Sequence, residues 1–461
     1  ARSAFRSGCT LMLRVSAFSH LLIFQSLQPC LKAAVLRGHR NVSDSVEELV
    51  AFYVYEGPGT EWLRDCDADE ILGSSLLPDV AMHHQMEKHP WRTWDPEAAS
   101  LFFVPAYVSA SVKGHCGDHL ENMASTARML NESPYYKKHD GADHIISSFA
   151  WYAKPTALGN LEPHTKQMIV AHFEALDKPE GGSFSGYFSR GSVTVPYGPF
   201  AVEASDIERA NATDFDAREH DLFFMGQADC RPAYMDRRMA IQQLRAAFGD
   251  AVLIQTPGEV KHEDSDACDQ LPTELAADIP SCGADGPWSG CAVTRKDHDL
   301  YLELGGSSKF ALVLPGDTPS TSRLYDAIQF GSIPIVVSHE GVFDGERGLF
   351  EAVAMPFPDD VPWSDFAIFI DEAAFREDPV GQMRAAVKRA KDPARREALA
   401  RARPALDWTA GGQCVATAVL KHVARRFLGR ETSSAVGSKI CRDAIGMKPT
   451  AFKAEASPPP T

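Results

Sequence analysis

The sequence predicts an α/β fold made of two domains, and three observations lead to this prediction. The chain has 461 residues, which is enough for two or three ordinary domains. Short apolar segments that suit buried strands alternate with helical segments, a pattern typical of βαβ units and a mainly parallel sheet. The alternation is interrupted by a polar stretch near residues 201–218 and then begins again, so we predict two domains joined there.

Five apolar segments predict the strands of the first domain. They lie at residues 49–57, 99–109, 143–152, 168–173 and 192–200. Helical candidates between them cover residues 79–89 and 118–130. Because strands and helices alternate, we expect the strands to be parallel.

The second domain repeats the same alternation. Its predicted strands lie at residues 221–227, 251–258, 307–317, 332–338 and 364–372. Its predicted helices lie at residues 235–249, 322–330 and 379–403. The predicted organisation is an amino-terminal segment at 1–45, domains at 46–205 and 206–430, and a tail at 431–461.

The charge of the chain excludes some classes of partner. The formal net charge is -16, from 62 acidic and 46 basic residues. Such a chain repels polymers of phosphate, so we expect no nucleic acid and no anionic membrane surface as a partner. A local basic pocket for one small anion remains compatible with this charge.

The first 45 residues resemble a signal sequence, a weak membrane anchor or a stem. Arg2, Arg6 and Arg14 occur without an acid and are followed by a short apolar run. The run is about half of the ~20 residues that a spanning helix needs, so an amphipathic first helix or a transit peptide fits as well. No other segment is long and apolar enough to predict a membrane span.

Cysteines and glycosylation sequons favour the secretory route. The chain has ten cysteines without a C-x-x-C pair, which argues against zinc ribbons and thioredoxin chemistry. Sequons begin at Asn41, Asn131 and Asn211. A few disulfides in an oxidising lumen, or buried free thiols, would both fit the scattered cysteines. We predict the lumen of the Golgi or endoplasmic reticulum.

Residues 314–338 contain the strongest candidate for a binding site. A predicted strand leads into a turn at Gly316 and Asp317, and a run rich in Ser and Thr follows and ends at Arg323. A helical pattern begins there and ends at Gly331, a residue that suits a left-handed helix end. Open α/β sheets bind ligands at the carboxyl ends of their strands, and a helix amino terminus with an arginine suits phosphate.

A sugar nucleotide would satisfy all the polar groups of this segment. Thr321, Ser322 and Arg323 suit a diphosphate, while Asp326, one turn further into the helix, suits sugar hydroxyls. The plain alternative is an ordinary capped helix with a surface Arg–Asp pair. No Walker loop, dinucleotide fingerprint or G-x-S-x-G elbow occurs, so we expect no cofactor beyond the donor itself.

Several segments resemble the exostosin family of glycosyltransferases, glycosyltransferase family 47. The most specific is residues 92–109, which match an Arg-Thr-x-Asp-Pro block that ends in Phe-Phe-Val-Pro. Residues 141–145 and 218–226 resemble further blocks, with Ala142 where the family commonly has Arg. Residues 314–338 resemble the donor-binding segment, with Ser332 in place of the usual Cys. The resemblance covers residues 48–375 in matching order.

The resemblance implies two Rossmann-like domains facing across a cleft, the GT-B type. It implies a nucleotide-sugar donor, expected to be a UDP-sugar, in the second domain and the acceptor in the first. The donor-binding residues implied in this way are Gly226, Arg238, Gly316, Asp317, Thr321, Ser322, Arg323 and Asp326. Gly226 would let the backbone come close to the donor. Arg238 would bind phosphate or lie on a solvated helix face, and Asp317 would reach the sugar or cap the helix.

The family also implies an inverting transfer to a glycan or polysaccharide acceptor without a metal. A general base must take the proton of the acceptor hydroxyl. We expect Asp143 and His144 to be this base or its neighbour, although a capping Asp and a packed His are equally consistent with the sequence. Glu56 is a more remote candidate, and His83 with its neighbour His84 suits a surface or packing face.

Two alternatives remain open at this stage. The Asp-x-Asp pairs that begin at Asp65 and Asp67 are typical of metal-dependent transferases, but they follow an acidic loop rather than an apolar strand, so a solvated loop explains them better. The departures at Ala142 and Ser332 allow a non-catalytic subunit or chaperone of a glycosyltransferase complex.

Overall fold

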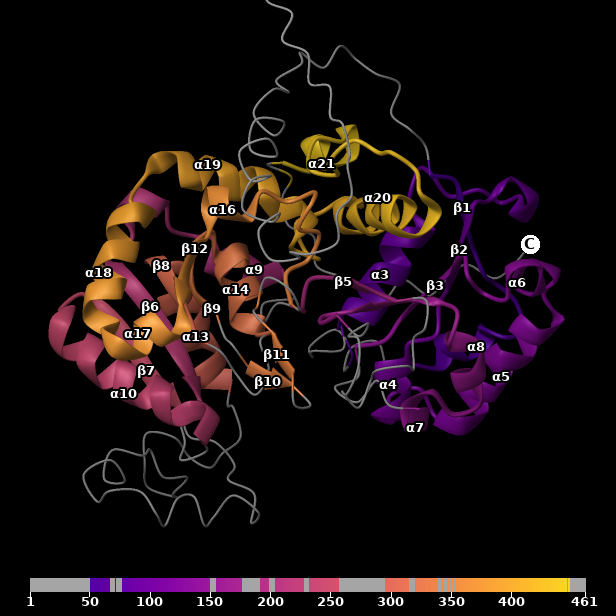
Figure 1. The fold of residues 1–461 in the computed structure, drawn as a ribbon, viewed down its shortest axis with the longest axis horizontal. Coiled ribbons are helices and arrows are strands. Elements are labelled where there is room, and N and C mark those ends of the chain that lie inside the picture. Colours follow the sequence, from indigo (N-terminus) through magenta and orange to yellow (C-terminus); the bar gives the residue numbers. More distant parts are fainter. Residues whose placement is uncertain are drawn as a thin grey trace, which may run out of the picture. The chain divides into compact units, whose positions relative to one another are not determined.

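A computed structural model gives the fold. The structure describes residues 50–66, 71, 77–149, 155–175, 191–198, 204–227, 232–256, 295–314, 320–338, 341–343, 346–348, 350, 354–445 and 447. By contacts the chain divides into the units Ala1–Glu47 and Glu48–Thr461, and all described residues belong to the second unit. That unit contains two parallel sheets, each covered by helices, which confirms the predicted α/β class (Figure 1).

The first lobe is built on a five-stranded parallel sheet. Its strands are β1 (Phe52–Val54), β2 (Leu101–Val104), β3 (His144–Ser147), β4 (Ile169–His172) and β5 (Ser192–Thr194). They lie side by side in sequence order, and each adjacent pair is parallel. All residues of β2, β3 and β4 are buried, as expected for strands covered on both faces. All five predicted strands of this lobe are confirmed.

Helices connect and cover these strands. They are α3 (Leu77–Glu87), α4 (Val108–Val112), α5 (His119–Glu132), α6 (Pro134–His139), α7 (Pro155–Leu158) and α8 (Glu162–Thr165). The predicted strand at residues 99–109 is too long, because α4 begins at its end. Pro105 lacks the N–H that would continue the ladder, and Tyr107 has a φ of 20°, which turns the chain.

The second lobe is built on another five-stranded parallel sheet. Its strands are β6 (His220–Gln227), β7 (Ala251–Thr256), β8 (Ser308–Val313), β9 (Ile333–Ser338) and β12 (Ile368–Asp371). Their spatial order is β7-β6-β8-β9-β12. The first strand of the lobe, β6, lies inside the sheet; β7 pairs on one side of it, and β8, β9 and β12 follow in order on the other side. This is the flavodoxin-like order, and its direction reverses between β6 and β8. A small antiparallel pair, β10 (Gly341–Phe343) and β11 (Glu346–Gly348), follows β9.

Helices lie on both faces of the second sheet, as Figure 1 shows. The helices among the described residues of this lobe are α9 (Ala204–Ala210), α10 (Pro232–Ala247), α13 (Arg295–Gly306), α14 (Ser322–Phe330), α16 (Trp363–Phe366), α17 (Glu372–Glu377), α18 (Pro379–Ala390) and α19 (Pro393–Ala402). The single helical region predicted at residues 379–403 is divided in two. Pro393 cannot continue a helix from its interior, and the Asp392 carboxylate accepts the N–H of Ala394 to start α19.

Two closing helices were not foreseen individually from the sequence, α20 (Cys414–Leu428) and α21 (Lys439–Ala444). The first of them packs on α3 of the first lobe. His89 Nε2 lies 3.0 Å from Thr417 Oγ1, and the Gln85 side chain accepts the N–H of Ala416 at 3.0 Å. The end of the described chain therefore returns to the amino-terminal sheet. Short 3₁₀ helices complete the structure at Glu61–Asp65, Pro96–Ala98, Gly159–Leu161, Phe215–Ala217 and Arg403–Ala405.

Disulfides join two pairs of the described cysteines. Cys66 is bonded to Cys116 in the first lobe, and Cys414 is bonded to Cys441, which ties α20 to α21. Of the two alternatives that the sequence left open, disulfides or buried free thiols, these four cysteines form disulfides. Within the described ranges no helix is both long and apolar enough to span a bilayer. The amino-terminal segment at 1–45, with its predicted anchor, lies outside the described residues.

Candidate functional site

The reversal of strand order between β6 and β8 locates a site. In open parallel sheets, ligands bind outside the carboxyl ends of the two strands at such a switch point. Here β6 ends with Met225, Gly226 and Gln227, and the segment after β8 leads into α14. We call residues 320–323 the helix entrance. The segment that resembles the family's donor-binding region therefore lies at the position where the topology expects a ligand.

Arg323 at the helix entrance is held against the end of β6. Its Nε donates to the carbonyl oxygen of Met225 at 2.9 Å, and its guanidinium lies 5.6 Å from the ring centre of Phe224. A Cβ added to Gly226 would be 2.4 Å from Arg323 Nη2, so no larger residue fits there without displacing the arginine. The sequence predicted that Gly226 permits a close approach, and in the structure the approaching group is this guanidinium.

The helix entrance lacks the ordinary cap that was the plain alternative. Thr321 is the N-cap residue, with extended backbone angles, and its side chain makes no capping hydrogen bond in the described structure. Ser322 is the first helical residue. The first N–H groups of a helix need an acceptor. The amides of this turn are therefore not satisfied by the Thr321 hydroxyl, which is the usual way such a helix start is closed.

Asp326 lies deeper than the sequence suggested. Its side chain is buried and accepts a hydrogen bond from the hydroxyl of Tyr301 on α13 at 2.7 Å. Burial, then the negative charge of Asp326, raises the pKa of Tyr301 well above its usual range, so Tyr301 remains a donor. The carboxylate thus contacts α13 beneath the helix entrance, and its burial excludes the surface Arg–Asp pair of the plain alternative.

Arginines on α10 add positive charge near the same strand. Arg238 is 1% exposed, which excludes the solvated helix face that the sequence left open. The neighbouring Arg237, which the sequence analysis did not single out, lies with its guanidinium 5.6 Å from the ring centre of Phe224. Arg323 is at the same distance from that ring. Buried guanidinium groups are costly without anionic or polar partners.

Two further predicted donor-binding residues, Gly316 and Asp317, lie outside the described residues.

Glu174 is a candidate that the sequence analysis missed. It follows β4 by two residues, at the carboxyl edge of the first sheet, and is 4% exposed. Its Oε1 accepts the N–H of Ser320 at 3.1 Å, so a carboxylate of the first lobe reaches the helix entrance of the second. His172 fixes the local turn, because its Nδ1 accepts the N–H of Glu174 at 3.1 Å. The available signal was an acid directly after a predicted strand.

Asp143 and His144 lie at the opposite edge of the first sheet. His144 is the first residue of β3, so the pair lies at the amino end of that strand, away from the edge where α/β sheets bind ligands. The ring of His144 is fully buried, with Nδ1 2.8 Å from Asp143 Oδ1 and Nε2 2.9 Å from the hydroxyl of Tyr55. It stacks on Phe102 with ring centres 4.8 Å apart. This geometry matches the packed His of the alternative interpretation and offers no free ring nitrogen to a substrate.

The other charged candidates of the first lobe also have structural partners. His83 is buried, and its Nδ1 is 2.9 Å from the hydroxyl of Tyr107. Burial lowers the pKa of His83 to about 3, so the ring is neutral and belongs to the packing face. Glu56 is ion-paired with Arg92. Of the Asp-x-Asp residues, Asp65 ends a 3₁₀ helix, and the other two lie outside the described residues.

The first lobe also contains a buried acid, Asp79, that the sequence did not suggest. Its Oδ2 accepts the N–H of Ser109 in α4 at 3.0 Å. Burial raises the pKa of Asp79 to about 6, and hydrogen bonds from Ser109 and Ser147 oppose this rise. Because its side chain is completely enclosed, Asp79 stabilises the start of α4 rather than facing a substrate.

Ser332, which stands where the family usually has Cys, makes hydrogen bonds through its hydroxyl group. Its hydroxyl donates to the carbonyl oxygen of Ser308 at 2.9 Å and accepts from Arg218 at 3.0 Å. Arg218 also donates to the carbonyl oxygen of Phe330 at the end of α14. Ser332 and Arg218 therefore contact the carboxyl end of α14 and the start of β8, and none of these contacts involves the helix entrance.

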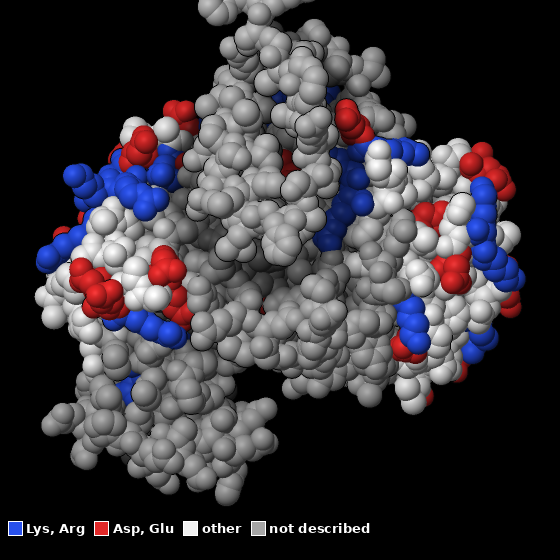
Figure 2. Space-filling model, viewed as in Figure 1, with Lys and Arg blue, Asp and Glu red and all other residues white. Residues whose placement is uncertain are grey.

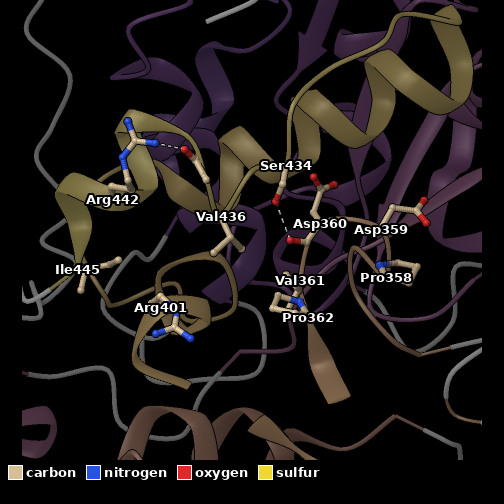
Figure 3. A pocket seen from close by; sticks show the side chains of 11 residues that line it. Pro358, Asp359, Asp360, Val361, Pro362, Arg401, Ser434, Val436, Arg442 and Ile445 are labelled. Carbon is tan, nitrogen blue, oxygen red and sulfur yellow. Dashed lines mark hydrogen bonds between the residues drawn. The ribbon is translucent and has the colours of Figure 1, made fainter. Parts of the chain in front are cut away.

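Two sizeable cavities lie elsewhere. One of about 480 Å³ lies between the 358–362 loop and α21, where Val436 and Ile445 project into it and Arg401 and Arg442 border it (Figure 3). Another of about 440 Å³ is lined by His422, Arg425 and other polar residues of α20 and its surroundings. Figure 2 shows basic side chains gathered over the part of the face where Figure 1 labels α20. Neither cavity includes a residue of α14, so neither lies at the helix entrance.

One group of potential metal ligands occurs among the described residues, Asp206, His298 and Asp299. It joins α9 to α13, and Asp299 is ion-paired with Arg209 at 2.5 Å. None of the three lies on β6 or α14. The expectation of transfer without a metal stays a prediction.

Comparison with known proteins identifies the family. Residues 47–385 match the model of the Exostosin GT47 domain, which covers well over half of the chain. The chain belongs to the exostosin GT47 family. The matched range includes the predicted resemblance over residues 48–375, which is confirmed.

Curated relatives carry glycosyltransferase names. A probable glucuronosyltransferase of Oryza sativa subsp. japonica is 22% identical over 69% of this chain and 66% of its own length. From Arabidopsis thaliana, a probable arabinosyltransferase is 25% identical over 61% of this chain and 52% of its own length. A probable beta-1,4-xylosyltransferase of the same plant is 23% identical over 79% of each chain. The chain thus spans half to two-thirds of the first two relatives.

Among solved structures, the similarities are distant. The amino-terminal domain of Candida albicans trehalose-6-phosphate phosphatase covers 85% of this chain and 99% of its own, at 9% identity and a TM-score of 0.41. An α,α-trehalose-phosphate synthase (UDP-forming) from Burkholderia vietnamiensis covers 73% and 72%, at 11% identity and a TM-score of 0.34. The assignment of the fold accordingly depends on the strand topology described above.

Proposed function

We propose that this exostosin-family protein is an inverting glycosyltransferase that moves a sugar from a nucleotide-sugar donor to a glycan or polysaccharide acceptor. The observation that carries the proposal is the placement of Arg323, held to the end of β6 at the switch point, where no side-chain cap from Thr321 is found among the described residues. The names of the curated relatives agree with the reaction class.

The helix entrance suits the diphosphate of the donor. Free N–H groups and the helix dipole favour an anion, and an arginine fork adds charge and directed hydrogen bonds. Arg323 already donates through Nε to Met225, so its orientation is set before a donor arrives. Thr321 and Ser322 supply hydroxyls beside it. We expect a UDP-sugar, with Asp326 and Tyr301 forming the polar base of the site.

In the transfer, the oxygen of an acceptor hydroxyl attacks the anomeric carbon of the donor sugar. The bond from that carbon to the phosphate oxygen breaks, and the nucleoside diphosphate leaves with the electron pair. Negative charge grows on the leaving phosphate, where Arg323 and the helix entrance stabilise it. Attack from the opposite face inverts the anomeric configuration, and no step requires a metal.

We place the protein in an oxidising compartment of the secretory route. Its described disulfides form readily there and are rare in reducing cytosol. Asn131 and Asn211, which begin two of the sequons, are exposed. An enzyme of the lumen of the Golgi or endoplasmic reticulum that acts on glycans would meet both its donor and its acceptor there.

The first test is the substitution Arg323→Ala. We expect UDP affinity, measured by calorimetry, to fall at least 10-fold, and transfer from the donor to fall further, because the arginine acts on the leaving phosphate. Arg323→Lys should recover part of the affinity, since it keeps the charge but loses the fork.

Arg128→Ala is the matched control. Arg128 is an exposed arginine of α5, ion-paired with Glu121, and its loss should leave binding and transfer unchanged. Full activity of the Arg323→Ala variant would refute the donor site. UDP binding without turnover on any glycan acceptor would instead support the non-catalytic subunit.

A further inference from the structure

Glu174 links the carboxyl edge of the first sheet to the helix entrance. Its carboxylate comes from the lobe expected to hold the acceptor, and its Oε1 accepts the N–H of Ser320, the residue before the N-cap of α14. The 3.1 Å contact is an ordinary hydrogen bond. A carboxylate in this position stands next to the proposed site of the donor diphosphate.

The other acids of the first lobe discussed above do not reach this position. Asp143 is bonded to His144 at the amino edge of the sheet. Asp79 is completely enclosed and serves α4. Glu56 follows β1 and is ion-paired with Arg92. Among these acids, Glu174 is the one that contacts the helix entrance.

We propose that Glu174 is the general base of the transfer, an inference that rests on the proposed function. In the reaction, the Glu174 carboxylate takes the proton of the acceptor hydroxyl while that oxygen forms its bond to the anomeric carbon. The bond between this carbon and the phosphate oxygen breaks, and its electrons leave with the nucleoside diphosphate. Charge and atoms balance: one carboxylate becomes a carboxylic acid, and one diphosphate is released.

The contact with Ser320 explains how the base is both held and released. Without a donor, the amide at the helix entrance stabilises the carboxylate. A bound diphosphate competes for the same region and repels the carboxylate, which frees it to turn toward the acceptor. The neighbouring negative charge also increases the proton affinity of Glu174, which suits a base.

The decisive variant is Glu174→Gln. The amide oxygen of Gln can still accept the N–H of Ser320, but it cannot take a proton at neutral pH. We expect kcat to fall by roughly 10²–10⁴-fold, the usual contribution of a general base. UDP affinity should stay within about 3-fold of the wild type, since the diphosphate contacts remain.

The pH profile distinguishes a base from a merely structural contact. The wild type should lose kcat on its acidic side as Glu174 becomes protonated, and this limb should vanish from the residual activity of Glu174→Gln. Asp143→Asn and the surface variant Glu121→Gln are the controls. Both should keep the wild-type limb and kcat within about 3-fold.

Three outcomes would overturn the inference. They are a Glu174→Gln variant with kcat within 10-fold of the wild type, one that keeps the acidic limb, or one that loses UDP affinity in parallel with kcat. The failure of the proposed function looks different. In that case the wild-type chain itself would neither bind UDP nor transfer a sugar, whatever residue stands at position 174.

Discussion

The two sheets have the same size and the same parallel pairing, yet they differ in strand order. The first runs from β1 to β5 without a reversal, whereas the second reverses between β6 and β8. A reversal separates the loops on either side and leaves a crevice at the carboxyl ends of the strands. The second lobe therefore provides the proposed donor site, and the first contributes Glu174 from its own carboxyl edge.

For the acids of the first lobe, position in the sheet matters more than residue type. Asp143 and Glu174 are both acids of the first lobe next to a strand, but one precedes β3 and the other follows β4. The first is tied to a buried His, and the second reaches another lobe. The end of the strand at which an acid lies thus decides whether it can reach the proposed site.

Gly226→Ala should give the largest effect on the second lobe. The new Cβ would lie 2.4 Å from Arg323 Nη2, so the guanidinium must leave the end of β6. We expect transfer to fall on the order of 100-fold, because a misplaced charge at the leaving group costs several kcal/mol. The measurements are calorimetry with UDP and initial rates of transfer.

Gly249→Ala is the matched control in the same lobe. A Cβ at that position meets nothing within 4 Å, and its φ is not in the left-handed region. It should leave rates unchanged. Normal activity of Gly226→Ala would show that the approach of Arg323 to β6 is dispensable. The switch point of the second sheet would then have no demonstrated role in transfer.

Asp79→Asn tests the buried acid of the first lobe through pH. The folded pKa of Asp79 is raised to about 6 from 3.8, so the protonated acid favours folding below its unfolded pKa. This contribution is lost as pH rises through about 6. Relative to Asp79→Asn, the wild type should lose roughly 2 kcal/mol of unfolding free energy between pH 4.5 and 7.5.

Urea unfolding of both proteins across this pH range measures the difference. Because the other ionisable groups are present in both, their contributions cancel. A difference that does not change with pH would mean that Asp79 is ionised throughout the range. UDP affinity should remain that of the wild type, since Asp79 is not part of the donor site.

Ser332→Cys should give the smallest effect. It installs the residue common in the family, and the thiol is a weaker partner for Arg218 and the carbonyl oxygen of Ser308. We expect a loss of about 1 kcal/mol in unfolding free energy and unchanged UDP affinity. A large change in affinity or transfer would mean that this departure from the family pattern affects the site itself.

Much of the fold could be predicted from the sequence because buried parallel strands leave a strong local pattern. All ten predicted strands are present, and Gly331 ends α14 with a φ of 67°. The errors occurred where local pattern was not decisive. Residues 108–112 form α4 because of a turn at Tyr107 and a distant carboxylate, Asp79. The return of α20 to α3 depends on contacts across more than 300 residues of sequence, as between His89 and Thr417.

The α/β class, the family and the arginine at the start of one helix could be predicted from the amino-acid sequence alone, because periodicity, turn residues and short blocks that resemble the family are local features. The tertiary structure was needed to show which distant groups each polar residue meets. It enclosed His144, directed Asp326 toward Tyr301 and brought Glu174 to Ser320. The physical reason is that strand order and the packing of one lobe on another are set by the whole chain, and no short segment encodes them.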